Sequence, residues 1–184
     1  MRFHIHLAAA ISIRDLIYLH GSAFVLCRLH TLDLSSNELR AMPAIDAFHS
    51  TNMRRVYLGR NFIASINLTN GERWSSLEWL DISCNLLSRI PPEIGNFAKL
   101  TRLDISHNAN LAEISDDIGR LSSLSELILD GLKLNNLPNN LATGPIKEII
   151  RFLQRRIKQV RFLLVSYDAY FSHRKAIRLD KVVN

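Results

Sequence analysis

Few residues of this sequence have the types and the spacing of a chemical site. His4 and His6 form a His-x-His pair that could touch a metal ion, but no third ligand lies nearby in the sequence. Asp116 and Asp117 stand close to Glu113 without the spacing of a calcium-binding loop, which favours a solvated acidic turn. Serine, histidine and aspartate occur without the Gly-x-Ser-x-Gly motif of a hydrolase. We therefore predict no catalysis, no metal site and no cofactor.

The residue types favour protein recognition instead. Tryptophan, tyrosine and arginine carry most of the binding energy at protein interfaces, and here they recur at a regular interval. The predicted partner-binding residues are Arg55, Tyr57, Trp79, Asp81, Arg102 and Asp104. The alternative is an ordinary surface on which arginine and aspartate pair across strands, and the sequence leaves both interpretations open.

These residues belong to a frame that repeats every 23–24 residues. The segment LHTLDLSSNEL begins at Leu29, and four further copies begin at Met53, Leu77, Leu100 and Leu124. A second set of apolar pairs follows in phase, from Leu39 and Met42 to Leu134 and Leu137, often with a proline next in the chain. Each unit therefore has a strand half and a return half. The pattern resembles the leucine-rich repeat and covers residues 29–142.

This resemblance implies an α/β leucine-rich repeat solenoid of about five repeats, with a parallel sheet on its concave face. Side chains alternate along a strand, so the first, fourth and sixth residues of each copy should point inward and the third and fifth outward. At the ninth place we expect a structural ladder of stacked asparagines that bind freed backbone groups: Asn37, Asn61, Asn85 and Asn108. The fifth copy has Leu132 instead, so the stack should end there.

Beyond the repeats the apolar spacing becomes helical. Residues 143–161 are predicted to form an amphipathic helix, begun by Thr143, Gly144 and Pro145, whose apolar side covers the exposed end of the fifth repeat. That side is formed by Ile146, Ile149, Ile150, Leu153, Ile157 and Val160, and the predicted basic face by Arg151, Arg155, Arg156 and Lys158. The two remaining segments are a divergent cap or irregular lead, 1–28, and a tail, 162–184, that could be disordered.

The stretch from Leu127 to Val160, and IIRFLQRRIK within it most of all, resembles the post-repeat segment of Roco-family leucine-rich repeat kinases. In that family a GTPase domain and then a kinase domain follow. Here Ser166-Tyr-Asp-Ala-Tyr170 stands where the resemblance implies a GxxxxGK[ST] phosphate-binding loop, and no kinase motif is present. We expect neither activity in this chain, and we expect the parent protein to continue beyond it.

Composition fits one ordinary domain of 184 residues with 47% hydrophobic and 22% charged residues. The net charge of +6 is uneven: the repeats are mildly acidic and residues 143–184 carry the basic excess, so we do not expect the chain to bind nucleic acid. No apolar stretch approaches the roughly 20 residues of a membrane span.

The expected partner is a protein, and the expected compartment is the cytoplasm, because Cys27 and Cys84 form no disulfide framework. The first residues are only faintly similar to a signal peptide, since His6 interrupts a short apolar run. Two alternatives stay open. One is a fragment of an extracellular leucine-rich repeat receptor, in which the motif Asn67-Leu-Thr69 could be glycosylated. The other is a nucleotide-binding fragment of the Roco GTPase.

Overall fold

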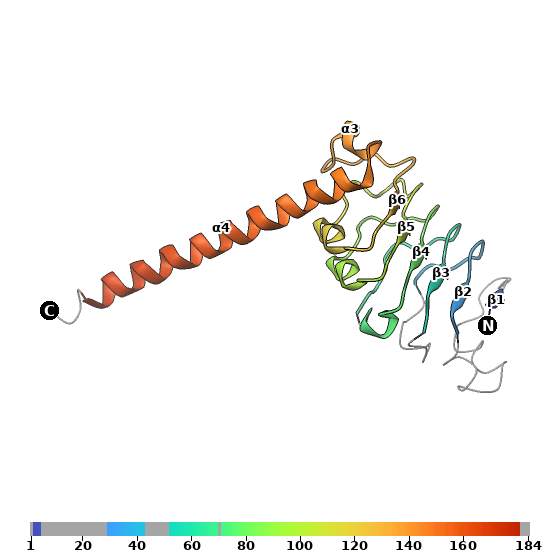
Figure 1. The fold of residues 1–184 in the computed structure, drawn as a ribbon, viewed down its shortest axis with the longest axis horizontal. Coiled ribbons are helices and arrows are strands. Elements are labelled where there is room, and N and C mark those ends of the chain that lie inside the picture. The colour runs from blue at the N-terminus through green and yellow to red at the C-terminus, as the bar shows by residue number, and fades with distance from the viewer. Residues whose placement is uncertain (1, 5–28, 43–51, 70, 181–184) are drawn as a thin grey trace.

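The computed structural model describes residues 2–4, 29–42, 52–69 and 71–180, with the backbone alone for 2–4, 72 and 166–180. His6, Cys27 and most of the lead 1–28 lie outside this description, and so does the side chain of His4. Among the described residues the predicted solenoid is confirmed. Each coil runs from a strand through a return segment to the next strand, so that the strands lie side by side in chain order (Figure 1).

One parallel sheet with the order β1-β2-β3-β4-β5-β6 forms one side of the solenoid. The sheet contains one strand more than the five predicted, because Arg2–His4 pairs in parallel with Thr31–Asp33. Each strand has only three residues, which is the part of each coil that pairs with its neighbours. The strands are β1 (Arg2–His4), β2 (Thr31–Asp33), β3 (Arg55–Tyr57), β4 (Trp79–Asp81), β5 (Arg102–Asp104) and β6 (Glu126–Ile128).

The return segments run along the opposite side and contain short 3₁₀ helices. These are η2 (Gly71–Trp74), η3 (Pro92–Asn96) and η4 (Asp116–Arg120). At the first turn of η3 a proline ring fixes φ at a helical value. At the start of η4 the Ser115 hydroxyl accepts a hydrogen bond from the Asp117 N–H, 3.2 Å away. Helices are restricted to single turns because the next strand must begin within one repeat.

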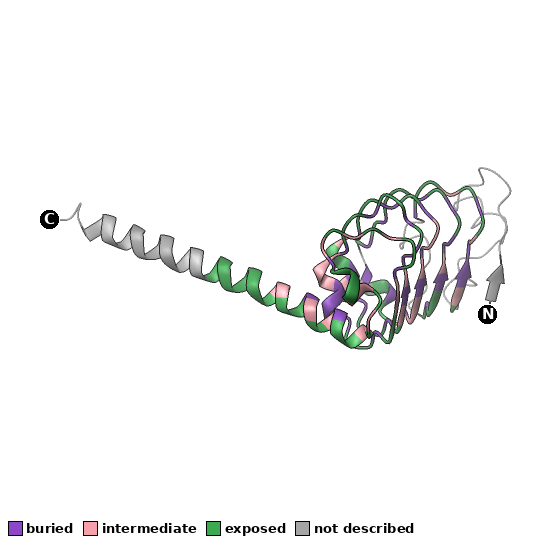
Figure 2. Cartoon of the chain, turned by 90° about the horizontal axis from the view of Figure 1, so that it is seen from above, coloured by how far each residue is buried: buried purple, intermediate pink, exposed green. Residues whose placement is uncertain are grey.

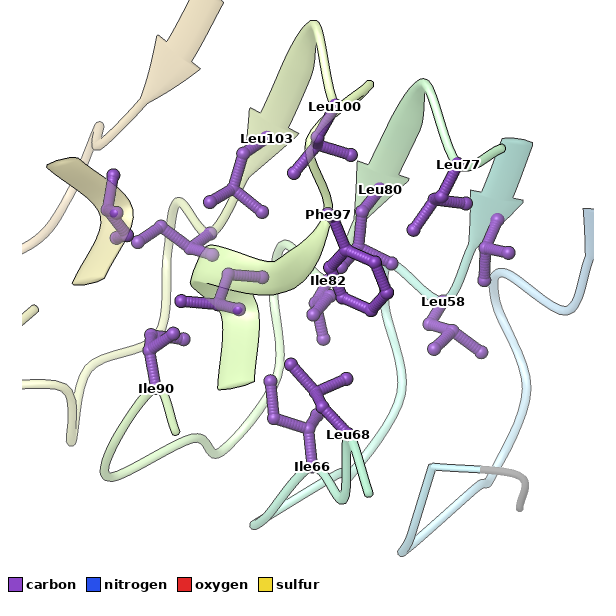
Figure 3. Packing of buried hydrophobic residues seen from close by; sticks show 14 of the residues in the cluster. Leu58, Ile66, Leu68, Leu77, Leu80, Ile82, Ile90, Phe97, Leu100 and Leu103 are labelled. Carbon is purple, nitrogen blue, oxygen red and sulfur yellow. The ribbon is translucent and has the colours of Figure 1, made fainter. Parts of the chain in front are cut away.

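The hydrophobic core is continuous along the solenoid, between the sheet and the return segments. Inward residues of the strand halves, such as Leu80 and Leu103, are fully buried, as the alternation predicts. Phe97 at the end of η3 reaches into the same layer and lies among the labelled strand leucines and Ile82 (Figure 3). Gly71 lies against this ring, since a Cβ at Gly71 would lie 3.2 Å from it. Trp74 is fully buried as well.

After a short helix α3 (Asn139–Ala142), the chain enters the long helix α4 (Ile146–Asp180). The helix starts near the predicted position but ends well beyond the predicted residue 161, and it takes in most of the segment expected as a tail. No glycine or proline interrupts the sequence between Ile146 and Asp180, so nothing in the backbone chemistry stops it.

The first turns of α4 cover the end of the solenoid as predicted. Ile149 and Leu153 are buried against the last coils, where α4 packs on η4. The apolar side was expected to remain covered as far as Val160, and here the expectation is wrong: Val160 is 53% exposed. The helix leaves the solenoid and projects away from it, and its side chains become exposed as it does so (Figures 1 and 2). The coils are too narrow to cover a helix of this length.

Candidate protein-binding face

The register of the sheet brings all six predicted binding residues into two neighbouring stripes. Arg55, Trp79 and Arg102 are aligned across β3, β4 and β5, and Tyr57, Asp81 and Asp104 are aligned beside them. The central residue of each strand points into the core, which leaves the residues on either side of it to face outward. The sequence frame thus located both stripes, although each strand contributes only three residues.

Trp79 is at the centre of this face and is held by contacts on two sides. Its ring meets the Tyr57 ring edge-on, with centroids 5.4 Å apart and planes at 64°. The Arg102 guanidinium lies over the Trp79 ring, with its central carbon 4.3 Å from the ring centroid. Such an aromatic pair is worth about 0.5–1.5 kcal/mol beyond burial, and a half-exposed cation–π contact about 0.5–1 kcal/mol. The indole is therefore fixed in orientation before any partner arrives, while part of its surface remains exposed.

One ion pair lies at the end of the first stripe and a second lies beside the stripe. The Arg102 Nη1 atom forms an ion pair with Glu126, 2.7 Å away, and beside the stripe Arg54 pairs with Glu78 at 3.0 Å. Arg55 is exposed and forms no ion pair with any residue that the structure describes. The Arg54–Glu78 pair is not among the predicted residues, although its signal is present in the sequence, because the two residues occupy the same place in successive repeats.

The aspartates of the second stripe shape the turns that follow the strands. The Asp81 carboxylate accepts a hydrogen bond from the Ser83 N–H at 2.9 Å, and the Asp104 carboxylate accepts from the N–H and the hydroxyl of Ser106 at 3.0 and 2.7 Å. One oxygen of each carboxylate is thus committed to the backbone. The face thus presents aromatic and guanidinium groups outward, with acidic groups held in place beside them.

The asparagines predicted to form a ladder lie beneath these turns and are all buried. The Asn85 amide nitrogen donates hydrogen bonds to the carbonyls of Leu58 and Ile82, at 2.9 and 3.2 Å, and its amide oxygen accepts from the Ile63 N–H at 2.9 Å. Asn61 and Asn108 repeat this pattern one coil earlier and one coil later. Asn37 donates to the carbonyls of Leu34 and Ser35. Each of the three inner asparagines therefore bonds two successive coils together.

The last coil is joined to the one before it by a different asparagine, outside the ladder. Leu132 occupies the ladder position of the last coil, and a second asparagine, Asn136, joins the return segments instead. Its amide nitrogen donates to the Ile114 carbonyl at 2.7 Å, and its oxygen accepts from the Ile114 N–H at 3.1 Å. Asn136 falls at none of the repeat positions that carry the frame, so this role could not be predicted from the spacing.

The four predicted basic residues of α4 do not form one face. Arg151, Arg155 and Lys158 are exposed, but Arg156 turns toward the solenoid. Its Nη1 donates to the Asn136 carbonyl at 2.8 Å, and its Nε lies 3.1 Å from Asp116. Arg156 thus helps to fix α4 on the last coil, and Asp116 belongs to an ion pair rather than to a solvated acidic turn.

The residues described contain neither a cluster of metal-binding side chains nor a membrane-spanning helix. These residues include no group of three or more histidine, cysteine, aspartate or glutamate side chains able to hold a metal ion. No helix in the described part of the chain has both the length and the apolar character needed to cross a bilayer.

Comparison with known proteins agrees with the repeat frame. Residues 51–109 and 76–137 match the family described as leucine rich repeat. Human vasorin is 34% identical over 117 residues, which covers 62% of this chain and 17% of vasorin. Leucine-rich repeat serine/threonine-protein kinase 1 from mouse is 24% identical over 163 residues, 74% of this chain and 8% of the kinase.

The fold also has counterparts among solved structures. A leucine-rich repeat protein of Leptospira interrogans matches with a TM-score of 0.52 at 24% identity, covering 65% of this chain and 36% of that one. This likeness shows the solenoid fold. The chain spans less than a fifth of the length of vasorin and of the kinase, so it corresponds to a small part of each.

Proposed function

We propose that this chain, a protein-interaction module whose residues 51–137 are leucine-rich repeats, binds its partner on the concave face with Trp79 at the centre of the contact. The observation that carries the proposal is the state of the Trp79 ring. It is held by Tyr57 and Arg102 in a fixed orientation, yet it is part-exposed in the middle of the sheet.

A pre-ordered aromatic side chain binds with a small entropic cost, because its rotamer is already fixed in the free protein. The neighbouring strands supply the surrounding contacts on a rigid sheet, which is the arrangement by which solenoids present binding surfaces. Arg55 has its guanidinium exposed without an ion pair to a described residue, so we expect an acidic group of the partner to contact it.

The test compares partner capture by the full chain and by single variants. Trp79→Ala and Arg55→Glu should each weaken binding by about 30-fold or more, as expected for residues whose loss costs about 2 kcal/mol. Arg89→Glu is the matched control, because Arg89 is also exposed but lies in a return segment. The thermal unfolding of all three variants should stay close to that of the parent chain.

Two results would contradict the proposal. If Arg89→Glu reduces capture as strongly as Arg55→Glu, the effect is one of net charge and the concave face is not the site. If Trp79→Ala unfolds the chain, Trp79 contributes mainly to the core rather than to recognition.

We also propose that the chain is the repeat segment of a Roco-type kinase and acts in the cytoplasm. In support, the alignment with the mouse kinase covers 74% of this chain, which is more than residues 29–142 alone would account for. A transcript that joins the codon for Val160 to a GxxxxGK[ST] segment would support this parentage. Isolation of the native chain with a glycan on Asn67 would contradict the cytoplasmic assignment and favour the extracellular alternative.

A further inference from the structure

The part of α4 that extends past the solenoid has an unusual surface. Ile149 and Leu153 are buried, but none of the side chains described after Leu153 is buried. The helix projects away from the coils (Figure 2). Four consecutive apolar residues then follow, and all are exposed: Phe162 by 73%, Leu163 by 66%, Leu164 by 59% and Val165 by 68%.

These four side chains face all sides of the helix. Each residue of an α-helix is rotated by about 100° from the one before it, so four in succession cover the whole circumference. A helix that is apolar all round is normally enclosed. A flat membrane surface or one neighbouring helix would cover only one side of this segment, whereas a groove that closes around the helix would cover them all.

The positive charge of the segment indicates the sign of the charge on its partner. Arg151, Arg155, Lys158 and Arg161 are exposed, and the sequence contains no aspartate or glutamate from Ile149 to Tyr167. The complementary surface must be acidic. A second copy of this chain would bring the same positive charge to the contact, so self-association through this segment is disfavoured.

We propose that residues 155–165 of α4 form a binding segment for an acidic EF-hand calcium sensor of the calmodulin type. Such sensors expose a methionine-rich apolar groove when they bind Ca²⁺, and they take up basic amphipathic helices. Apolar anchors for the groove have the spacing i, i+3 and i+7 at Ile157, Val160 and Leu164. Phe162 extends from the opposite side of the helix, and Val165 lies between the two sides. The site is separate from the concave face, and the proposal does not depend on the function proposed for that face.

The probe is purified calmodulin, titrated with the full chain in the presence of Ca²⁺ and again with a chelator. We expect saturable binding with Ca²⁺ that is lost with the chelator and weakened by salt. Phe162→Glu and Leu164→Glu should each weaken binding at least about tenfold. Neither side chain is buried, so both variants should keep the circular dichroism spectrum of the parent chain.

The matched control is Phe62→Glu, because Phe62 is a comparably exposed aromatic residue on the solenoid, at 53%. It should leave binding within about twofold of the parent chain. The proposal is overturned if calmodulin does not bind, if the chelator makes no difference, or if Phe62→Glu weakens binding as much as Phe162→Glu. It is also overturned if Phe162→Glu instead abolishes a dimer of the chain, or its binding to anionic vesicles.

Discussion

The asparagine ladder leads to a prediction about where the solenoid is most sensitive to the loss of one side chain. Asn85 and Asn108 are both buried and each bonds two coils, but their surroundings differ. When Asn85 is replaced by alanine, the Leu58 carbonyl keeps its hydrogen bond from Asn61, and the Ile82 carbonyl keeps the one from Asn108. Only the Ile63 N–H loses its partner.

Asn108→Ala removes more. The Leu87 N–H loses its partner, and so does the Ile105 carbonyl, because the next coil has Leu132 in place of an asparagine that would share it. A buried polar group left without a partner costs about 1–3 kcal/mol. Asn85→Ala should therefore lower the free energy of unfolding by about 1–3 kcal/mol, and Asn108→Ala by about twice that amount.

The assay is urea unfolding followed by circular dichroism, with Asn110→Ala as the control. Asn110 belongs to the same coil as Asn108 but is exposed, so its replacement should change stability by less than about 0.5 kcal/mol. If Asn85→Ala proves as destabilising as Asn108→Ala, the sharing of carbonyls between neighbouring asparagines does not determine the cost, and the reasoning fails.

Two further predictions concern backbone positions. Gly119→Ala should lower the free energy of unfolding by about 1–3 kcal/mol in the same urea assay. The new Cβ would lie 3.0 Å from the backbone nitrogen of Gln154 and 3.1 Å from the Leu153 Cβ. An unchanged stability would show that α4 is not packed closely there. Cys84 has φ of 52°, so Cys84→Val should destabilise by about 1–2 kcal/mol while Cys84→Gly is better tolerated, and equal effects would contradict a conformational cause.

The sequence predicted the fold and the alignment of the two outward stripes because both depend on strict periodicity. Leu80 and Trp79 alternate between core and surface by the same rule that places Leu103 and Arg102, so one frame fixes every coil. Contacts between distant segments produce no periodic pattern in the sequence, so they could not be predicted. Asn136 meets Ile114, and Arg156 meets Asp116, only after the last coil has folded.

A backbone conformation that recurs in every copy could not be predicted from the sequence either. The eighth place of every copy has a positive φ, from 52° at Cys84 to 72° at Gly131. Serine, arginine, cysteine and histidine fill this place in the other copies, and they share no preference for that conformation. In these four copies the next residue is a ladder asparagine that donates to the carbonyls of the turn, as Asn85 does to Ile82 and Ser83, whereas the fifth copy has no such asparagine and has glycine at the eighth place. Residue types at the eighth place alone could not reveal the shared conformation.

The attachment of α4 determines how the two proposed binding surfaces are related. Leu153 is buried, the Gln154 side chain donates to the Gly119 carbonyl at 2.9 Å, and Arg156 reaches Asn136. Contacts to separate segments of the last coils prevent the helix from turning about a single point. The direction of the projecting segment is therefore set by the solenoid itself. A partner on the concave face and a sensor on residues 155–165 would be held at a fixed separation, and loosening the contact at Gly119 should alter their relative position without removing either surface.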